Sequence, residues 1–550
     1  MIDMVYGLAD NTTLPAGEDG CCDVRFAFFT YYGPESGKPE VSIGKVEEIA
    51  QRDANHDGLR ICRLTGIPEG GPYTLDLSYG SEHRMVYHNL YVRRRGSALP
   101  PPPHYVCGFS SERKDGQTYV VRGLASGAVL QRGSDDRCDI RFVIHGEGEV
   151  MVSGIDCELC ETGKDPYDSE REFSLRGIPV GGPYSFALTI GETALPFDNV
   201  YVGDNWLCSG QSNMEANAPM TDYDRAQVPD ETVRYLSKGN EWLPATPVLK
   251  GYGGVTCAYY FARKMREYTG VPQGILHYAI GGSPLYTWKP SDEPVFVPSR
   301  YGTLIRRALL AGGRVRGVFW FQGCAEARRP LCQAIFTENM KELVSAFRRD
   351  LGDPKIPFVQ CQVCRWHWRE TTIDSVDHWW SEFRAKQLGL SEEIDTLDTV
   401  TAITAKTVDG LHIDAAAQRQ VGTNAAEAMM HMIAPDDDRF LPYIRPEKIT
   451  VSGDSVFVRF KNLHGDLTAS GNESGFALTE STHVLTGNQP YAVELRGDTA
   501  VLKCCMDTEE LRRQYLYYGF GNSFYCNITD SAGRPIPAFG PVSLAEDVSF

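Results

Sequence analysis

The stretch around which the fold is organised reads Gly203-Asp204-Asn205-Trp206-Leu207-Cys208-Ser209-Gly210-Gln211-Ser212-Asn213-Met214-Glu215. An apolar, β-prone run precedes it, and polar residues able to open a helix follow. A strand, a sharp turn of small residues and a helix start predict an exposed hydroxyl among backbone N–H groups. Ser209 and Ser212 both fit this role, and spacing alone does not choose between them. Met214 replaces the last glycine of a Gly-x-Ser-x-Gly elbow, so the stretch is a different motif.

Length and charge limit the possible functions. A chain of 550 residues predicts about three to five domains, and 42% hydrophobic residues can fill several cores. The formal net charge of −18 argues against nucleic acid or an anionic membrane as a partner. The sequence has no apolar run of about 18 residues, so no membrane-spanning helix is expected.

The 16 cysteines are expected to be free thiols. The start of the chain, residues 1–6, has neither a basic segment nor an apolar signal core, which favours a cytoplasmic location. Two Cys-x-x-Cys pairs, Cys157/Cys160 and Cys361/Cys364, fall in different predicted domains and do not supply the four ligands of a zinc site. We therefore expect no metal and no cofactor, with a metal or redox role of the second pair as the alternative.

The N-terminal third of the chain is a duplicated unit. Residues 22–26, Cys-Asp-Val-Arg-Phe, return as Cys-Asp-Ile-Arg-Phe at 138–142, and Gly-Ile-Pro-x-Gly-Gly-Pro-Tyr occurs at 66–73 and again at 177–184. Short alternating runs between Gly/Pro turns predict a β-sandwich domain for each copy. Four prolines end the connection between the copies, which predicts a stiff, extended linker. We expect both copies to be scaffolds, with sugar binding as the alternative.

The rest of the chain changes pattern twice. From about Tyr201 to Met432, apolar strands alternate with helical segments, which predicts a parallel sheet covered by helices. Strand signals return from Asp436 to the end. A tryptophan cluster at 366–380 is expected in the core, with a sugar platform as the alternative. The predicted domains are a β-sandwich at 1–96, a linker at 97–105, a β-sandwich at 106–200, an α/β catalytic domain at 201–435 and a β-sandwich at 436–550.

A serine nucleophile needs a general base and a carboxylate that orients it. Asp-x-x-His occurs twice, as Asp53/His56 and as Asp409/His412, and either pair could arise by chance. The second pair ends the α/β region, so we expect Asp409 to orient His412 as the base. Asp53 also begins a pattern similar to a calcium loop, but Leu64 stands where the closing Glu would be, so a β-turn is expected.

The Gly-Gln-Ser-Asn-Met block with its flanks resembles SGNH-type carbohydrate esterases, in particular the sialate O-acetylesterase-like family. Residues 129–132, in the second predicted β domain, and residues 517–520 also resemble that family. The resemblance therefore implies that the first β domain is an additional module. The resemblance implies an α/β fold, an SGNH-hydrolase (flavodoxin-like) parallel-sheet domain flanked by β-sandwich domains. It also implies that Ser212 is the nucleophile.

The same resemblance implies an oxyanion hole. The second block is Ile280-Gly281-Gly282-Ser283, and the third is Trp320-Phe321-Gln322-Gly323. The chain then departs from the family, because Cys324-Ala325-Glu326 stands where Glu-Ser/Thr-Asn/Asp is usual; restoring Glu at 324 is expected to be tolerated. The candidate oxyanion-hole residues are Ser212, Gly281, Gly282 and Gln322, and the candidate substrate contacts are Asn213, Trp288 and Glu326.

The sequence therefore predicts a serine esterase that hydrolyses O-acetyl esters on a carbohydrate through an acyl-enzyme. His412 would deprotonate Ser212, and an acetylated carbohydrate would be the partner. The alternatives are an acetyl-xylan-type esterase and a catalytically weak carbohydrate-binding protein, which the altered block after Gly323 keeps open. The identity of the sugar, the acetyl position and the oligomeric state do not follow from the sequence.

Overall fold

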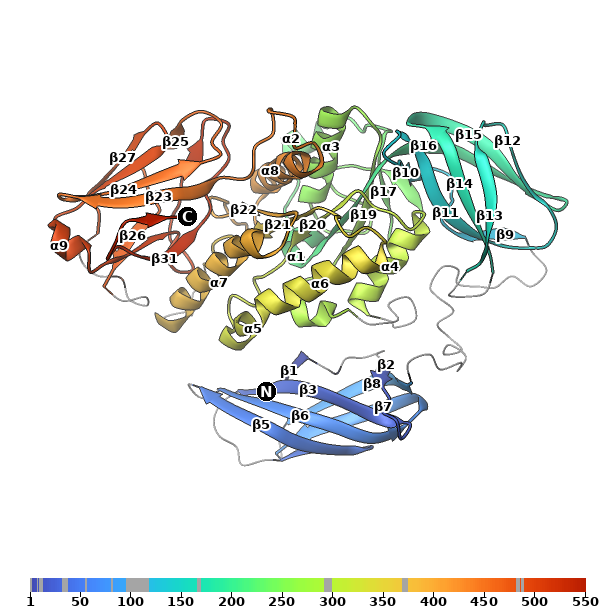
Figure 1. The fold of residues 1–550 in the computed structure, drawn as a ribbon, viewed down its shortest axis with the longest axis horizontal. Coiled ribbons are helices and arrows are strands. Elements are labelled where there is room, and N and C mark those ends of the chain that lie inside the picture. Colours follow the sequence, from blue (N-terminus) through green and yellow to red (C-terminus); the bar gives the residue numbers. More distant parts are fainter. Residues whose placement is uncertain are drawn as a thin grey trace. The chain divides into compact units, whose positions relative to one another are not determined.

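The structure is a computed structural model (Figure 1). It describes residues 2–6, 8, 13–31, 38–54, 57–80, 83–94, 118–165, 170–290, 299–367, 374–480, 485 and 489–550. Two compact units are present: residues 1–117, 164–170 and 285–306 form the first, and residues 118–163, 171–284 and 307–550 form the second. The predicted linker at 97–105 and His56 lie outside the described residues. Within these ranges, no helix has the length and apolar character needed to cross a membrane.

The described residues of the first unit form two four-stranded sheets, in the orders β1-β3-β6-β5 and β2-β8-β7-β4. Phe26 and Phe28 of one sheet and Leu75 and Leu77 of the other share one buried core. β5 and β6 pair Ala54 with Asp57, so the segment that resembled a calcium loop connects two antiparallel strands. The strands are β1 (Ile2–Tyr6), β2 (Thr13–Pro15), β3 (Cys21–Tyr31), β4 (Pro39–Val41), β5 (Lys45–Ala54), β6 (Asp57–Pro68), β7 (Gly70–Tyr79) and β8 (His83–Arg93).

The second β domain repeats the contacts of the first. The Tyr73 hydroxyl donates to Pro68 O at 3.2 Å, and the Tyr184 hydroxyl donates to Pro179 O at 3.0 Å. The sequence repeat is therefore also a structural repeat. The strands are β9 (Tyr119–Arg122), β10 (Val129–Gln131), β11 (Arg137–His145), β12 (Val150–Ser153), β13 (Glu158–Lys164), β14 (Arg171–Pro179), β15 (Gly181–Ile190) and β16 (Thr193–Gly210).

Strand β16 runs through the expected boundary between the second β domain and the α/β domain. Its first part pairs with β15 and with β10, and Asp204 to Gly210 pair in parallel with β19 (Gln273–Ala279). The predicted boundary at residues 200 and 201 therefore falls inside one continuous strand.

The central sheet has the strand order β18-β17-β19-β16-β20-β21-β22. Five of its parallel strands, β16, β19, β20, β21 and β22, numbered along the chain, follow the order 2-1-3-4-5 of flavodoxin-like sheets, and β17 adds a further parallel strand beside β19. β20, β21 and β22 are buried along their whole length, as expected when helices cover both faces. The remaining bounds are β17 (Val233–Leu236), β18 (Trp242–Pro244), β20 (Gly317–Phe321), β21 (Phe358–Gln362) and β22 (Leu397–Thr401).

Helices cover the two faces of this sheet (Figure 1). Phe319 of β20 packs against Phe261 of α3 (Cys257–Thr269), which lies beside α8 (Ala415–Ile433). On the other face, Phe358 of β21 packs against Phe347 of α6 (Phe336–Asp350), next to α7 (Asp374–Glu393). The remaining helices of the described residues are α1 (Ser212–Glu215), α2 (Asp222–Arg225), η1 (Leu285–Trp288), α4 (Arg300–Leu310), α5 (Pro330–Ala334) and α9 (Thr508–Leu511). Of these, η1 and the part of α4 up to Arg306 belong to the first unit.

The described residues of the C-terminal domain form three small sheets with a shared core. Gln362 of β21 accepts a hydrogen bond from Ala538 N and donates one to Ala538 O, both at 2.9 Å, so this domain is bonded directly to the central sheet. The strands are β23 (Arg445–Ser452), β24 (Ser455–Lys461), β25 (Leu467–Ala469), β26 (Phe476–Thr479), β27 (Ala492–Arg496), β28 (Thr499–Lys503), β29 (Tyr515–Tyr518), β30 (Ile528–Asp530), β31 (Phe539–Ser543) and β32 (Val548–Ser549).

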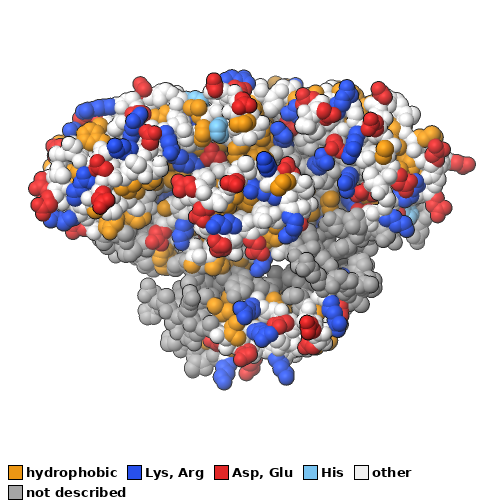
Figure 2. Space-filling view, viewed as in Figure 1, with side chains coloured by type: hydrophobic (Ala, Val, Ile, Leu, Met, Phe, Trp, Pro, Cys, Tyr) orange, Lys and Arg blue, Asp and Glu red, His pale blue; other side chains and the backbone are white. Residues whose placement is uncertain are grey.

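The surface carries both charge signs. On the face drawn in Figure 2, acidic and basic side chains are interspersed over the described residues. The formal charge of −18 is therefore not gathered into one patch on this face.

Candidate active site

The predicted site residues of the second unit follow the carboxyl ends of its parallel strands. In doubly wound sheets, ligands bind at this edge, where the strand order reverses. Here the reversal lies at β16, between β19 and β20. Ser212 follows β16, Gly281 and Gly282 follow β19, Gln322 follows β20, and Asp409 and His412 follow β22.

Only one of the two candidate serines has a free hydroxyl. Ser209 is fully buried in β16, and its hydroxyl donates to Tyr278 O at 2.6 Å. Ser212 is the first residue of α1, and its hydroxyl has no hydrogen-bond partner among the described residues. Gly210 makes the turn between them at φ +141°, where a Cβ would lie 2.1 Å from Phe321 O. The geometry therefore favours Ser212.

Asp409 and His412 form a tight local pair. Asp409 Oδ2 lies 2.6 Å from His412 Nδ1, and Asp409 Oδ1 accepts from His412 N at 2.8 Å and from Leu411 N at 3.1 Å. Burial alone would raise the pKa of Asp409, but these donors outweigh it and lower the pKa below its ordinary value. The ionised carboxylate favours the tautomer with the proton on Nδ1, which leaves Nε2 of His412 as a base.

Asn213 joins the serine segment to the histidine segment. Its Oδ1 accepts from Ile413 N at 3.0 Å, and its Nδ2 donates to Leu411 O at 3.4 Å. Leu411 and Ile413, the residues on either side of His412, are thus both hydrogen-bonded to Asn213, which follows Ser212 in the chain. No hydrogen bond joins Ser212 Oγ to His412 within the described part of the chain. Such bonds are often long without substrate and tighten in the reactive complex.

The backbone N–H groups near Ser212 differ in availability. Gly281 lies beside the serine, since a Cβ on it would be 3.7 Å from Ser212 Cβ, but its N–H donates to Glu215 Oε2 at 2.7 Å. The N–H groups of Ser212 and Gly282 have no hydrogen-bond partner in the described ranges. Gly282 also faces open space, with no atom within 4 Å of a Cβ built there. These two N–H groups are available to an oxyanion in this arrangement.

Gln322 is buried and its amide hydrogens are engaged. Nε2 donates to Ser283 O at 3.2 Å and to the Glu326 carboxylate, while Oε1 has no partner among the described atoms. Gln322 would have to release one of these acceptors to bind an oxyanion. Glu326, considered from the sequence as a substrate contact, is 1% exposed and contacts Gln322. A carboxylate therefore reaches the Gln322 amide from position 326, while position 324, where Glu is usual in the family, is Cys.

Two tryptophans of the cluster at 366–380 are buried, and Trp379 is half-buried. Trp366 and Trp380 are buried and stacked with ring centroids 5.3 Å apart, and the Arg328 guanidinium lies 5.5 Å from the Trp366 ring. Trp288, a candidate substrate contact, is buried in η1 of the first unit. Its position relative to Ser212, which lies in the second unit, is not determined. Trp368 lies outside the described residues.

Sequence reasoning missed the side chains that hold these loops together. Gln211 Oε1 accepts from Gly323 N at 2.9 Å, and Glu215 holds Gly281 as described. Gln211 and Glu215 lie within three residues of Ser212 in the same motif, so the sequence could have indicated a role for them at the site. Gln418 Nε2 donates to Asn213 O at 2.9 Å from α8, and nothing in the local sequence indicates that contact.

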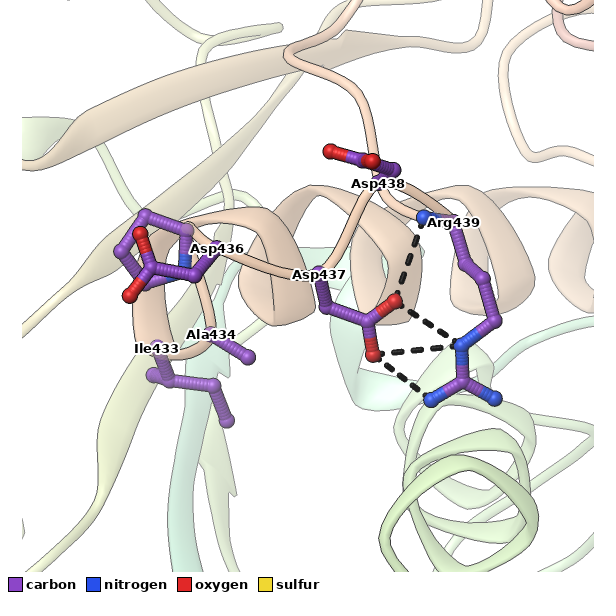
Figure 3. A pocket seen from close by; sticks show the side chains of 7 residues that line it. Ile433, Ala434, Asp436, Asp437, Asp438 and Arg439 are labelled. Carbon is purple, nitrogen blue, oxygen red and sulfur yellow. Dashed lines mark hydrogen bonds and ion pairs between the residues drawn. The ribbon is translucent and has the colours of Figure 1, made fainter.

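An open hollow beyond α8 carries three consecutive aspartates. Figure 3 shows Asp437 turned toward Arg439, whose Nε lies 2.9 and 3.1 Å from the carboxylate oxygens. Its lining contains neither a serine nor a histidine. In the described part of the chain, no cluster of three or more His, Cys, Asp or Glu residues is arranged to hold a metal.

Residues 202–431 match the family model described as "carbohydrate esterase, sialic acid-specific acetylesterase". The chain resembles the sialate O-acetylesterase-like carbohydrate esterases. That resemblance, predicted from the sequence, is confirmed. A probable carbohydrate esterase of Arabidopsis thaliana is 26% identical over 164 residues, which cover 28% of this chain and 55% of that protein. This chain therefore spans about half of the relative's length.

A solved carbohydrate acetylesterase from Xanthomonas citri superimposes with a TM-score of 0.59 at 20% identity. The match covers 77% of this chain and 99% of that one, and it shows a shared fold. The region matched by the acetylesterase family model includes Ser212, Asp409 and His412, whereas both N-terminal β domains lie almost entirely outside it.

Proposed function

We propose that this chain is a serine esterase that removes O-acetyl groups from a carbohydrate. Ser212 is the nucleophile, His412 is the base and Asp409 orients the base. The observation that carries the proposal is the free Ser212 hydroxyl, linked through Asn213 to a His412–Asp409 pair with a 2.6 Å hydrogen bond. The strand order supports an SGNH-type domain, and the paired sheets with shared cores support β-sandwich modules.

The reaction proceeds through an acetyl-enzyme. His412 Nε2 takes the proton of Ser212 Oγ as this oxygen attacks the acetyl carbonyl, and Asp409 stabilises the imidazolium. The N–H groups of Ser212 and Gly282 bind the developing oxyanion. The imidazolium then protonates the departing sugar oxygen. Water, deprotonated by His412, releases acetate and regenerates Ser212.

Acetylated sialic acids are the first substrates to test, because the matched family model describes sialic acid-specific acetylesterases. Acetylated xylan oligosaccharides are the second. Acetate release from each set, compared at equal enzyme concentration, assigns the sugar class.

The test of the catalytic assignment uses a chromogenic acetyl ester. His412→Ala should lower turnover by about 10⁴-fold or more, because the serine loses its base. His464→Ala, in a part-buried contact with Glu427 outside the site, is the control and should retain turnover. Wild-type turnover by the His412 variant would contradict the proposal.

Two observations favour a second candidate, a carbohydrate-binding protein with weak catalysis. The Gly281 N–H is held by Glu215, and Gln322 Nε2 is held by Ser283 and Glu326. Calorimetric binding of acetylated oligosaccharides without acetate release would support this candidate over the esterase.

A further inference from the structure

The segment that carries His412 is a loop held by its own backbone, in which Val408 N donates to His412 O at 2.8 Å, and by side chains from other segments. Residues 409–412 are bends between β22 and α8. Leu411 O, the carbonyl directly before His412, accepts hydrogen bonds from Asn213 Nδ2 at 3.4 Å and from Cys364 Sγ at 3.1 Å. Ile413 N, directly after His412, donates to Asn213 Oδ1 at 3.0 Å. Both peptide groups that flank the proposed base are therefore bonded to Asn213.

We propose that Asn213 and Cys364 are positioning residues, which fix the peptides on both sides of His412 and so aim its imidazole at Ser212. The inference rests on the proposed function. It assigns Asn213 a different role from the substrate contact expected from the sequence.

Asn213 is suited to positioning and not to contact with substrate. It is 1% exposed, and each polar atom of its side chain has a protein partner. Its backbone is also fixed, because its carbonyl accepts from Gln418 Nε2 at 2.9 Å and Gln418 Oε1 accepts from Cys257 N at 2.8 Å. The side chain therefore connects a rigid helix pair to the loop of the base.

Cys364 supplies the second donor to Leu411 O. Its thiol is fully buried and lies 3.9 Å from Asn213 Nδ2. Its carbonyl is held by Trp380 Nε1 at 3.0 Å and by Arg384 at 2.8 Å, so the residue has little freedom to move. The Cys324 side chain interacts with Cys364, which extends the network to the position where the chain departs from the family pattern.

The contact predicts a specific effect on kinetics. A misplacement of about 1 Å can cost about 10²-fold in rate, and a side chain that never contacts substrate should leave binding unchanged. Asn213→Leu should lower kcat by about 10- to 10²-fold with KM within about twofold. Asn424→Leu is the matched control, because Asn424 is another buried asparagine and its Nδ2 donates to the Tyr443 hydroxyl at 3.5 Å. It should retain kcat.

Cys364 has a conservative variant that separates positioning from packing. Cys364→Ser keeps a donor to Leu411 O and should retain kcat within about threefold, whereas Cys364→Ala should lower it by about tenfold. Cys504→Ala, which removes a buried thiol of the C-terminal domain, is the control for loss of a thiol. Equal kcat values for the Ser and Ala variants would overturn the assignment of Cys364.

Hydrogen exchange gives a readout that needs no catalysis. In the folded Asn213→Leu protein, the Ile413 amide should exchange at least tenfold faster than in the wild type and in Asn424→Leu. Unchanged exchange, or a raised KM with unchanged kcat, would overturn the inference. If the wild-type protein hydrolyses no acetyl ester while Asn213→Leu still speeds this exchange, the proposed function fails and the loop contact stands.

Discussion

Cys324 shows how one side chain can change the meaning of a motif. It is buried against Cys364, and a carboxylate from Glu326 already bonds Gln322. The contact with Cys364 and, after it, burial raise the pKa of the Cys324 thiol, so this thiol stays neutral at pH 7. The site is thus built with a neutral thiol at 324, and the carboxyl group that reaches Gln322 comes from 326.

The expectation that Cys324→Glu is tolerated changes with this geometry. A carboxylate at 324 would be buried next to a thiol and close to Glu326, and burying a charge is costly unless its hydrogen bonds are satisfied. Arg328 and Arg384, which act on Cys324 electrostatically, would offset part of this cost. We expect the variant to lose about 2 kcal/mol or more of unfolding free energy. Urea denaturation at pH 7 measures this loss, with Cys324→Ser as the control. A variant as stable as the wild type would contradict this reading.

At the scale of elements, the turn from β16 into α1 sets the position of Ser212. Gly203 and Gly210 bound the part of β16 that crosses the central sheet. A Cβ at Gly203 would lie 2.0 Å from Pro272 O, and one at Gly210 would lie 2.1 Å from Phe321 O. Pro272, directly before β19, and Phe321 of β20 therefore approach β16 more closely than any other residue permits at these two positions.

Two glycine substitutions should have opposite effects. Gly210→Ala places a methyl group against β20 at a φ of +141°, so we expect a loss of about 3 kcal/mol or more and no esterase activity. Gly389→Ala in α7 has no atom within 4 Å of the new Cβ and should gain up to about 1 kcal/mol. Thermal unfolding of both variants tests the pair. A neutral Gly210→Ala would show that the strands can separate.

At the scale of the whole molecule, the second β domain and the central sheet share a buried ion pair. Arg132 Nε and Nη2 donate to the two oxygens of Asp204 at 2.9 and 2.8 Å. Gln131 Oε1 accepts from Asn205 N at 2.7 Å in the same contact. One junction thus joins residues 129–132, Val-Leu-Gln-Arg, to residues 203–206, Gly-Asp-Asn-Trp. In the sequence these two runs looked like separate motifs.

Breaking this junction should cost far more than breaking a surface pair. Arg132→Ala leaves the fully buried Asp204 carboxylate without its main partner, so we expect a loss of about 3–5 kcal/mol. Arg314→Ala removes the ion pair between Arg314 and Asp139, whose side chains are 51% and 27% exposed. This variant should lose less than about 1 kcal/mol of unfolding free energy. Urea denaturation distinguishes them. Equal losses would contradict the role of the junction.

Contacts close in sequence could be predicted, and those between distant segments could not. Asp409 and His412 are three residues apart, and the strand and turn signals of the repeat are local, so the sequence carried both. The choice between Ser209 and Ser212 depends on Tyr278, 69 residues away. The bond between Asn213 and Ile413 spans 200 residues. Such contacts arise from tertiary packing, which composition and periodicity do not encode.

The most direct measurement is to identify the residue labelled by a serine-directed phosphonate. The intact protein is treated, digested and analysed by mass spectrometry, with the His412→Ala variant in parallel. We predict a single adduct on the peptide that contains Ser212, assigned to Ser212 by fragmentation, and labelling at least 10²-fold slower in the variant. An adduct on Ser209, or equal labelling rates in the two proteins, would contradict the account.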